Sequence, residues 1–451
     1  MSPHIISNPL NIKLMKKFIL FLLCASSLYA QSFDAKKIDS LFNTMDMNLE
    51  AMGGISIASE ENEVYKNYFG FSNLELKQKN NKETKHRIGS ITKTFTATLI
   101  MQLVDEGKLK LDTRLNQFFP SIPNAKKISI EDLMRHRSGL YNVTNDDDIR
   151  SWVVHPQTRE KMLGRFVENG VDFEPKTKTQ YSNTNFILLS YIIEDIDNKT
   201  YQEALNSRII NPLKLERTLF GQEIALNKNE AFSYSKETEG WELIDMQTHL
   251  SAPMGAGAIV STPRELCIFY ESLFNGGLVS KASLERMMTI EENMGMGMTQ
   301  LVFKGLEVYG HDGGIDGFQS FALYIPQKRT SIAIALNGVD VQLMPIVIKA
   351  LELYFENDPE LKSESKIELD TKDLDVYLGT YSGETFPAKV VFTKEGNVLI
   401  AQATGQPAFK LMAVDKNIFK YDAMGISFAF DLENNTMLLN FGGKKHTLDK
   451  E

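Results

Sequence analysis

Apolar and polar positions along the chain follow two periods, and together they predict a mixed fold. Apolar residues recur at helical spacing over 33–49, 128–135, 161–169, 186–196, 201–210, 264–273 and 343–355. Short runs typical of strands occur at 53–58, 64–69, 302–309, 318–324 and 331–336. Helices and strands therefore share one unit, which we expect to be of the α/β (α+β) class.

The most apolar stretch follows directly after Gly89-Ser90. An apolar run from Phe95 to Val104 closes at Asp105-Glu106-Gly107, which predicts a buried helix with Ser90 in its first turn and Gly107 just past its end. Lys93 lies three residues after Ser90, so both side chains share one helical face. Burial lowers the pKa of a lysine and can make it a base that activates a serine. Alternatively, Ser90 is an N-cap and Lys93 is solvated.

Two further polar clusters can complete such a site. The first cluster is Tyr181-Ser182-Asn183. The Tyr181 phenol, beside a cationic lysine, should have a lowered pKa and exchange protons with the serine. Asn183 can bind a substrate amide. The alternative is a tyrosine at a turn and an asparagine that caps a helix. The second cluster, at 310–314, separates two strands, where its glycines form a tight turn or let a strand approach a bound acyl group.

Beyond the final predicted helix the composition changes. Residues 357–372 are charged and contain Pro359, which predicts a linker between a large first domain at 31–356 and a second domain at 373–451. Short alternating runs at 389–392, 398–400, 428–430 and 437–439 predict that this second domain is small and all-β.

The N-terminus has the three parts of a secretory signal peptide. A basic head at Lys16-Lys17 precedes an apolar core that begins at Phe18, and a small residue, Ala30, ends the segment. We expect 1–30 to be removed after Ala30, which places the protein in the periplasm or outside the cell without a stable membrane span. Met15 is a second candidate start. A membrane anchor is disfavoured because the apolar run is too short, and acylation at Cys24 is disfavoured by the bulky residue before it.

Composition excludes several classes of function. The 451-residue chain carries a formal net charge of −9, so it has no electrostatic case for binding nucleic acid or an anionic membrane. Its two cysteines, Cys24 and Cys267, cannot form a disulfide framework once the signal peptide is removed. The seven histidines show no close pairing, and no phosphate loop or nucleotide fingerprint occurs, so we expect no metal and no cofactor.

Three motifs in order resemble those of the serine β-lactamase and penicillin-binding protein superfamily. The motifs are S-x-x-K at Ser90 and Lys93, Y-x-N at Tyr181 and Asn183, and an H-x-G form of the third motif at 311–313. The segments LMRHRSGL, FEPKTKTQYSNTNF and GAGAIVSTPREL are also similar to connecting segments of the class C β-lactamase-related family, which includes D,D-peptidases, D-aminopeptidases and esterases. The resemblance extends from about residue 33 to residue 355.

This resemblance implies an antiparallel sheet flanked by helices, with an all-helical region between the first and third motifs. It implies that Ser90 is the nucleophile and that Lys93 and Tyr181 share the base and acid roles. Backbone N–H groups of Ser90 and Gly314 would form the oxyanion hole. The residues it implies for substrate binding are Asn183, His311, Asp312 and Gly313, and His136 would be a structural support.

Two departures from the family pattern concern the site. Lys176 stands where relatives usually have glycine, which affects the loop that leads to Tyr181. Asp312 replaces the usual threonine, and an acid there should repel the carboxylate of a β-lactam. Alternatively, Asp312 points away from the pocket and caps a turn. Residues 376–451 resemble small barrel domains appended to some relatives.

The sequence thus predicts a serine hydrolase that forms an acyl-enzyme on Ser90. Its expected partner is a small-molecule or peptide substrate, and D-amino-acid peptides, amides or small esters fit best. A class C-like β-lactamase and a penicillin-binding sensor or scaffold with little turnover are the alternatives. The loops at 142–160 and 219–251 should decide the substrate, and the oligomeric state is left open.

Overall fold

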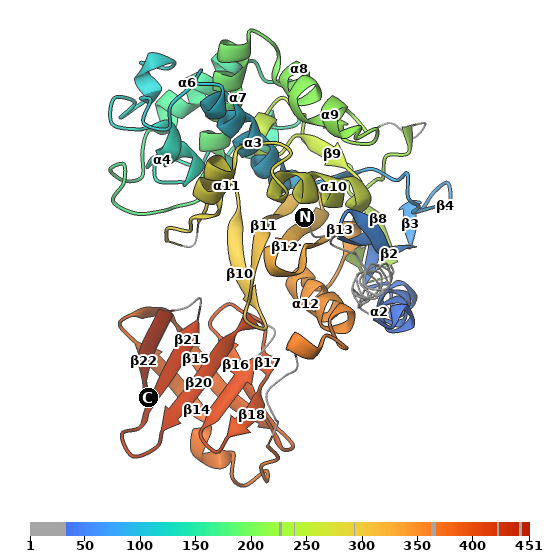
Figure 1. Cartoon of the computed structure of the whole chain (residues 1–451), viewed down its shortest axis with the longest axis vertical. Coiled ribbons are helices and arrows are strands. Elements are labelled where there is room, and N and C mark those ends of the chain that lie inside the picture. The colour runs from blue at the N-terminus through green and yellow to red at the C-terminus, as the bar shows by residue number, and fades with distance from the viewer. Residues whose placement is uncertain are drawn as a thin grey trace, which may run out of the picture.

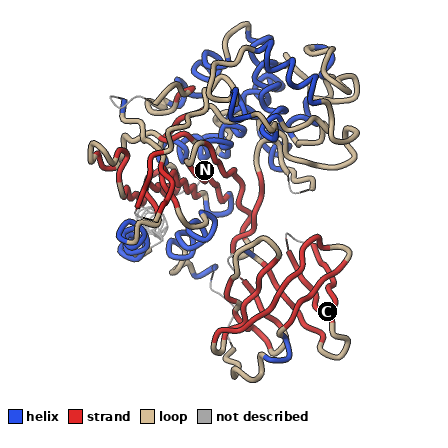
Figure 2. The backbone as a smooth tube through the Cα atoms, turned by 180° about the vertical axis from the view of Figure 1, so that it is seen from behind, coloured by secondary structure: helices blue, strands red, loops and turns tan. Residues whose placement is uncertain are grey.

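The chain folds into a helix-covered antiparallel sheet joined to a separate β-barrel (Figure 1). The computed structural model describes residues 33–224, 228–238, 240–292, 294–361, 367–421, 424–441 and 444–451. The predicted signal peptide at 1–30 lies outside these residues. Figure 2 shows the same arrangement from behind, with the helices in one part of the molecule and a second part built almost wholly from strands.

The main sheet has eight strands, in the order β10-β11-β12-β13-β1-β2, with β7 and β8 joined at β13. The strands are β1 Ala51–Ser59, β2 Asn62–Phe69, β7 Tyr234–Glu237, β8 Gly240–Leu243, β10 Thr299–Phe303, β11 Leu306–Ile315, β12 Phe318–Ile325 and β13 Thr330–Val339. All neighbours on the path are antiparallel. Between β11 and β12, Asp316 and Gly317 both have positive φ, 49° and 81°, as a two-residue hairpin turn of type I′ requires.

Helices cover both faces of this sheet. On one face, α2 (Ala35–Met47) and α12 (Leu343–Tyr354) pack on alternate residues of β13, such as Ile332 and Ile334. On the other face, α10 (Pro263–Phe274) packs against small residues, among them Ala333 and Ala58. Because both of its faces are buried, β13 is apolar almost throughout.

An all-helical region is inserted between β5 and β10, as the resemblance implied. Its helices are α3 Thr92–Asp105, α4 Ile130–Met134, α5 Ile149–Trp152, α6 Arg159–Asn169, α7 Asn183–Asp197, α8 Tyr201–Leu205, α9 Asn211–Leu213 and α11 Lys281–Met288. The predicted buried helix is α3, and Gly107 lies just past its end with φ of 69°, as predicted. The segment 219–251, which we expected to be irregular, in fact contains β7, β8 and the short strand β6 Leu219–Phe220.

A small sheet holds the segment that leads to Ser90. In it, β9 (Ile259–Ser261) pairs with both β5 (His86–Arg87) and β6. A separate two-stranded sheet joins β3 (Phe71–Asn73) and β4 (Gln78–Lys79).

The C-terminal part is a nearly closed antiparallel barrel, which confirms the predicted all-β character. Its nine strands follow the order β17-β16-β15-β14-β22-β21-β20-β19-β18, and only Leu411 separates the two end strands in sequence. They are β14 Gly379–Gly383, β15 Phe386–Glu395, β16 Val398–Ala403, β17 Phe409–Lys410, β18 Met412–Asp415, β19 Ile418–Tyr421, β20 Ile426–Asp431, β21 Thr436–Phe441 and β22 Lys444–Lys450. The barrel has a hydrophobic core of its own.

The stretch predicted as a linker includes residues that pack on each of the two cores. Leu361 packs on the core of the main sheet, whereas Ile367 and Leu369 pack on the core of the barrel. Both ends of the stretch 357–372 therefore belong to packed units. Across the part of the chain that the structure describes, no helix combines the length and apolar character needed to cross a membrane.

Candidate active site

Ser90 lies in a tight turn between β5 and α3. The turn is a 3-10 helix at Gly89–Ile91, so Ser90 precedes the α-helix and is neither in its first turn, as predicted, nor its N-cap, which is Ile91. Gly89 has φ of 49°, and a Cβ there would lie 2.7 Å from the backbone nitrogen of Gly314. Only glycine fits this position. The backbone of the Ser90 turn thus lies directly against the end of β11.

Lys93 is wholly buried and points at Ser90, so the alternative of a solvated lysine is wrong. Its Nζ lies 3.0 Å from Ser90 Oγ, and it donates to Asn183 Oδ1 and to the carbonyl of Ala256, each at 2.7 Å. Burial holds the Lys93 pKa well below its ordinary value, against the opposing charge of Asp312. A neutral amine has two hydrogens, and the two oxygen acceptors use both. The lone pair then faces Ser90 Oγ.

Tyr181 contacts the same oxygen from the other side. Its hydroxyl donates to Ser90 Oγ at 2.7 Å, and its ring stacks on His136 with centroids 4.5 Å apart. Burial raises the Tyr181 pKa, the negative charge of Asp312 raises it further, and the hydrogen bond to Ser90 opposes both. Our expectation that this pKa would be lowered is wrong in direction, because burial of the hydroxyl outweighs the hydrogen bond that lowers it. Tyr181 therefore keeps its proton at neutral pH.

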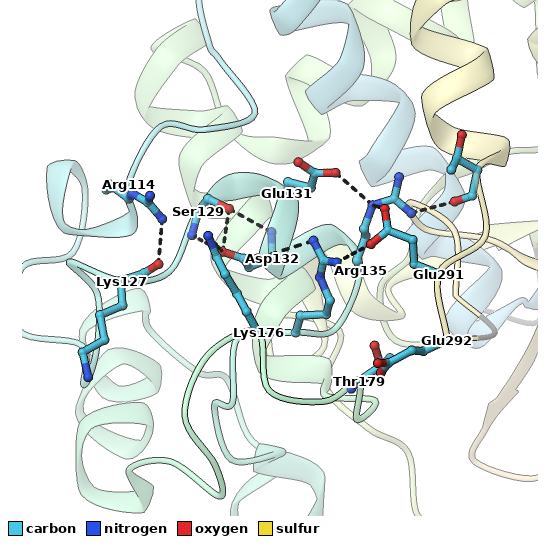
Figure 3. Close-up of polar contacts among 12 residues, drawn as sticks. Arg114, Lys127, Ser129, Glu131, Asp132, Arg135, Lys176, Thr179, Glu291 and Glu292 are labelled. Atoms are coloured by element: carbon cyan, nitrogen blue, oxygen red, sulfur yellow. Dashed lines mark hydrogen bonds and ion pairs between the residues drawn. The ribbon is translucent and has the colours of Figure 1, made fainter.

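The loop before Tyr181 is fastened to α4 (Figure 3). Lys176 has φ of 71°, which explains why glycine is usual at this position, and its Nζ lies 3.7 Å from Oδ2 of the buried Asp132. Its backbone N–H donates to the carbonyl of Arg137 at 2.8 Å. Farther along the loop, the N–H of Thr179 donates to Glu292 Oε2 at 2.8 Å. These contacts fix the path by which the loop reaches the site.

His136 supports the tripeptide that contains Tyr181. The backbone N–H of Ser182 donates to His136 Nδ1 at 3.1 Å. Burial lowers the His136 pKa well below its ordinary value, and the nearby Lys93 and His311 act in the same direction. A neutral imidazole that accepts a backbone hydrogen bond and stacks on Tyr181 fits the structural role implied for it.

Asn183 is the first residue of α7, and the N-cap of that helix is Ser182, so the alternative that Asn183 is the cap is wrong. Its backbone N–H donates to Asn142 Oδ1 at 2.9 Å, and its Nδ2 donates to Thr144 Oγ1 at 3.0 Å. With Lys93 on its Oδ1, the Asn183 amide orients the lysine. A contact between Asn183 and substrate stays a prediction.

The third motif is part of a strand. We expected 310–314 to separate two strands, but β11 continues through it, and the turn lies at Asp316-Gly317. Gly313 permits this, because a Cβ there would lie 2.0 Å from the carbonyl oxygen of Ile88. His311 is buried, its Nδ1 lies 2.6 Å from the carbonyl of Asp312, and burial together with Lys93 lowers its pKa to about 4. His311 is therefore neutral at pH 7.

Asp312 lies on the opposite face of β11 from His311. Its side chain is 68% exposed, and Oδ1 is 3.6 Å from His311 Nδ1. A turn-capping role does not fit a residue paired in the middle of two strands, here with Phe321. The charge of Asp312 raises the pKa of Lys93 and of Tyr181, so it acts on the site.

A cavity of about 260 Å³ opens beside Ser90. Its walls are mainly apolar and include Val143, Ile149, Trp152, Val153, Ile187, Ala252, Pro253 and Ile315. Part of the wall comes from residues 142–153. We expected a polar loop at 142–150, but the segment folds into a 3-10 turn and α5. The irregular spacing of its apolar residues gave no sign of this wall.

Two contributors to the site were not anticipated. The carbonyl of Ala256 binds Lys93, and the side chain of Asn142 holds Asn183. A backbone acceptor leaves no side-chain signature, and an asparagine in a polar loop is too common to single out. Within the described ranges, the structure contains no cluster of three or more His, Cys, Asp or Glu side chains placed to hold a metal ion.

Several known proteins are similar to this chain. A profile described as Beta-lactamase matches residues 50–346. The teichoic acid D-alanine hydrolase of Staphylococcus aureus is 29% identical over 198 residues, which are 44% of this chain and 48% of that one. The chain thus spans about half the length of this curated relative.

Two solved structures are also similar. A D-stereospecific amidohydrolase from a Streptomyces species matches at 27% identity with a TM-score of 0.61, over 69% of this chain and 97% of that one. The octameric penicillin-binding protein homologue from Pyrococcus abyssi is 24% identical with a TM-score of 0.64, over 92% of this chain and 100% of that one. The second match has the same fold across nearly the whole chain.

Proposed function

This chain belongs to the beta-lactamase family and is a serine hydrolase of that family, and we propose that it cleaves D-amino-acid amides, peptides or small esters through an acyl-enzyme on Ser90. The observation that carries the proposal is the position of Ser90 Oγ. It accepts a hydrogen bond from Tyr181 at 2.7 Å and lies 3.0 Å from the Nζ of a wholly buried lysine. A serine placed between a proton acceptor and a proton donor is equipped for acyl transfer.

Acylation uses the two buried groups in opposite roles. Neutral Lys93 takes the Ser90 proton as Oγ attacks the substrate carbonyl, and the backbone N–H groups of Ser90 and Gly314 receive the oxyanion. Tyr181, which holds its proton, passes it to the leaving amine or alcohol. The Lys93 ammonium then returns a proton to the phenolate, whose ring centroid lies 4.8 Å from Nζ. In deacylation water takes the place of the leaving group.

Charge favours neutral or cationic substrates over anionic ones. His311 is neutral at pH 7, burial favours the neutral form of Lys93, and Asp312 holds an exposed carboxylate 3.6 Å from His311 Nδ1. An anionic β-lactam or a peptide with a free carboxylate meets repulsion there, whereas a free amine is attracted. The apolar cavity beside Ser90 suits the side chain of the acyl group.

The names of the relatives support a D-configured substrate. One is a teichoic acid D-alanine hydrolase and another a D-stereospecific amidohydrolase. Because we predict a signal peptide, we expect the protein to encounter its substrate outside the cytoplasm.

Mass spectrometry of the intact protein tests the proposal. We expect short-lived adducts with a D-phenylalanine amide and a p-nitrophenyl ester, slow reaction with penicillin, and no adduct on Ser90→Ala. A penicillin adduct that lasts for hours favours the sensor alternative, and rapid penicillin turnover favours the β-lactamase alternative. Turnover retained by Ser90→Ala contradicts the mechanism.

A further inference from the structure

A buried ion pair lies next to the site but contains none of the proposed catalytic groups. Arg87 and Asp316 are only 3% and 4% exposed, and their Nη1 and Oδ2 atoms are 2.5 Å apart. Full burial of two charges costs desolvation energy, so such a pair gives little net stability compared with apolar side chains of similar size. The pair instead fixes the relative orientation of its two partners, because the guanidinium is a planar group with fixed donor positions.

The two partners are placed symmetrically about the predicted oxyanion hole. Arg87 ends β5 three residues before Ser90, and Asp316 follows β11 two residues after Gly314. The pair therefore joins the two chain segments that supply the two backbone N–H groups.

Both partners are also tied to a third segment, which forms part of the cavity wall. Arg87 Nη1 donates to the carbonyl of Thr248 at 2.8 Å. In return, Thr248 donates to Asp316 through its backbone N–H at 3.0 Å and through Oγ1 at 2.6 Å. Thr248 itself lines the cavity beside Ser90. One ion pair thus connects the serine turn, the end of β11 and the cavity wall.

Glycine backbone forms much of the contact between the serine turn and β11. Gly89 lies against the backbone of Gly314, and Gly313 lies against the backbone of Ile88. A Cβ at either glycine would collide with the opposite segment. Ser320 Oγ donates to the carbonyl of Ile88 at 2.9 Å and fixes one point of this contact. The Arg87–Asp316 pair fixes a second point, on the cavity side.

We propose that Arg87 and Asp316 are positioning residues that set the separation of the Ser90 and Gly314 N–H groups and so tune the oxyanion hole. This inference rests on the acyl-enzyme mechanism proposed above. A misplacement of one donor by a fraction of an ångström weakens transition-state binding while leaving substrate binding in the cavity nearly intact.

Three variants test the inference in the full-length protein. Asp316→Asn tolerates the positive φ at this position but removes the charge. The double variant Arg87→Gln with Asp316→Asn removes both charges, so no buried charge is left unpaired. The control is Asp197→Asn, which weakens another ion pair, with the partly buried Arg208, about 21 Å along α7 from Asn183.

The measurements are kcat and KM for a p-nitrophenyl ester, the Kd of phenylboronic acid, which forms a tetrahedral adduct on a serine, and the melting temperature. For Asp316→Asn we expect kcat and boronate affinity to fall together by about tenfold to a hundredfold, with KM within threefold of the parent value. The double variant should regain melting temperature without regaining kcat. Asp197→Asn should lose melting temperature only.

Two results overturn the inference: a double variant that regains kcat together with stability, or an Asp316→Asn protein whose kcat per titrated active site equals that of the parent. Failure of the mechanism itself is distinguishable, because the parent protein would then show no boronate binding that depends on Ser90.

Discussion

At the scale of single residues, burial decides which group is base and which is acid. Lys93 and Tyr181 lie in the same dry site, and burial favours the uncharged form of each. For the lysine this means a lowered pKa and a free lone pair, and for the tyrosine it means a raised pKa and a retained proton. One physical cause therefore produces both members of the acid–base pair.

The first prediction concerns the pH profile. Since Lys93 acts when deprotonated, kcat/KM should rise with pH through a midpoint well below the ordinary lysine value of 10.5. It should fall again only above the ordinary tyrosine value of 10.0, as Tyr181 loses its proton. A stopped-flow profile with a p-nitrophenyl ester measures both limbs.

Tyr181→Phe is the control for this profile. It should lower kcat by about 10²- to 10⁴-fold and remove the high-pH limb while leaving the rising limb in place. A rising limb centred near 10, in either protein, would contradict the lowered pKa of Lys93.

The second prediction concerns Asp312. Asp312→Thr removes the exposed carboxylate beside His311, so kcat/KM for penicillin and for D-Ala-D-Ala peptides should rise by about tenfold to a hundredfold. A neutral ester should change little, and a D-amino-acid amide with a free amine should become a poorer substrate. Kinetics with the three substrate types on both proteins measure the effect, and a uniform change across all three argues against selection by charge.

The sequence could predict the chemistry of this site better than its electrostatics. Spacing and motif order pointed to Ser90, Lys93 and Tyr181, and the structure brings these three side chains into contact. The predicted direction of the Tyr181 pKa shift was wrong because burial of the hydroxyl, which no local pattern reveals, is the largest cause of the shift. The carbonyl of Ala256 also helps to hold the lysine. The sequence could not predict this contact, because a backbone acceptor leaves no side-chain signature.

At the scale of elements, the end of β11 shows how local composition can mislead. Glycines at 310, 313 and 314 favour a turn on propensity, yet the strand continues, because Gly313 passes within van der Waals distance of Ile88. The actual turn is Asp316-Gly317, a dipeptide that favours a type I′ hairpin. Close approach to another segment depends on the tertiary structure, so the sequence alone could not distinguish a turn from a continuous strand here.

The third prediction concerns the loop before Tyr181. Lys176 adopts a left-handed conformation, so Lys176→Gly should be more stable than Lys176→Ala by about 0.5–1 kcal/mol, although both lose the contact with Asp132. Thermal or urea unfolding of the two variants measures the difference. At Lys178, whose φ is not positive, the same pair of substitutions should show the opposite order. The same order at both positions contradicts the assignment of backbone strain to Lys176.

At the scale of the whole molecule, the chain has separate cores that meet at a small contact. The hairpin of β10 and β11 extends from the main sheet to the barrel (Figure 1). There Tyr421 and Met424 pack against both cores, and Val302 lies next to Gly425. The change in composition near residue 357 predicted two units, but not that this hairpin would join them, because the contact depends on the length and direction of two strands.

The last prediction follows from the separation of the cores. Ile426→Val removes one methylene from the barrel core, and Ile193→Val removes one from the core around α7. Each should cost about 0.5–1.5 kcal/mol in its own unit. In a unit as small as the barrel, 1 kcal/mol lowers the melting temperature by about 4–8 °C, and the shift is smaller in the larger unit.

Calorimetry should therefore show that Ile426→Val shifts one transition while the temperature at which esterase activity is lost stays unchanged. Ile193→Val should lower that inactivation temperature and leave the barrel transition in place. If either variant moves both transitions equally, the two units unfold as one, and the hairpin contact couples them.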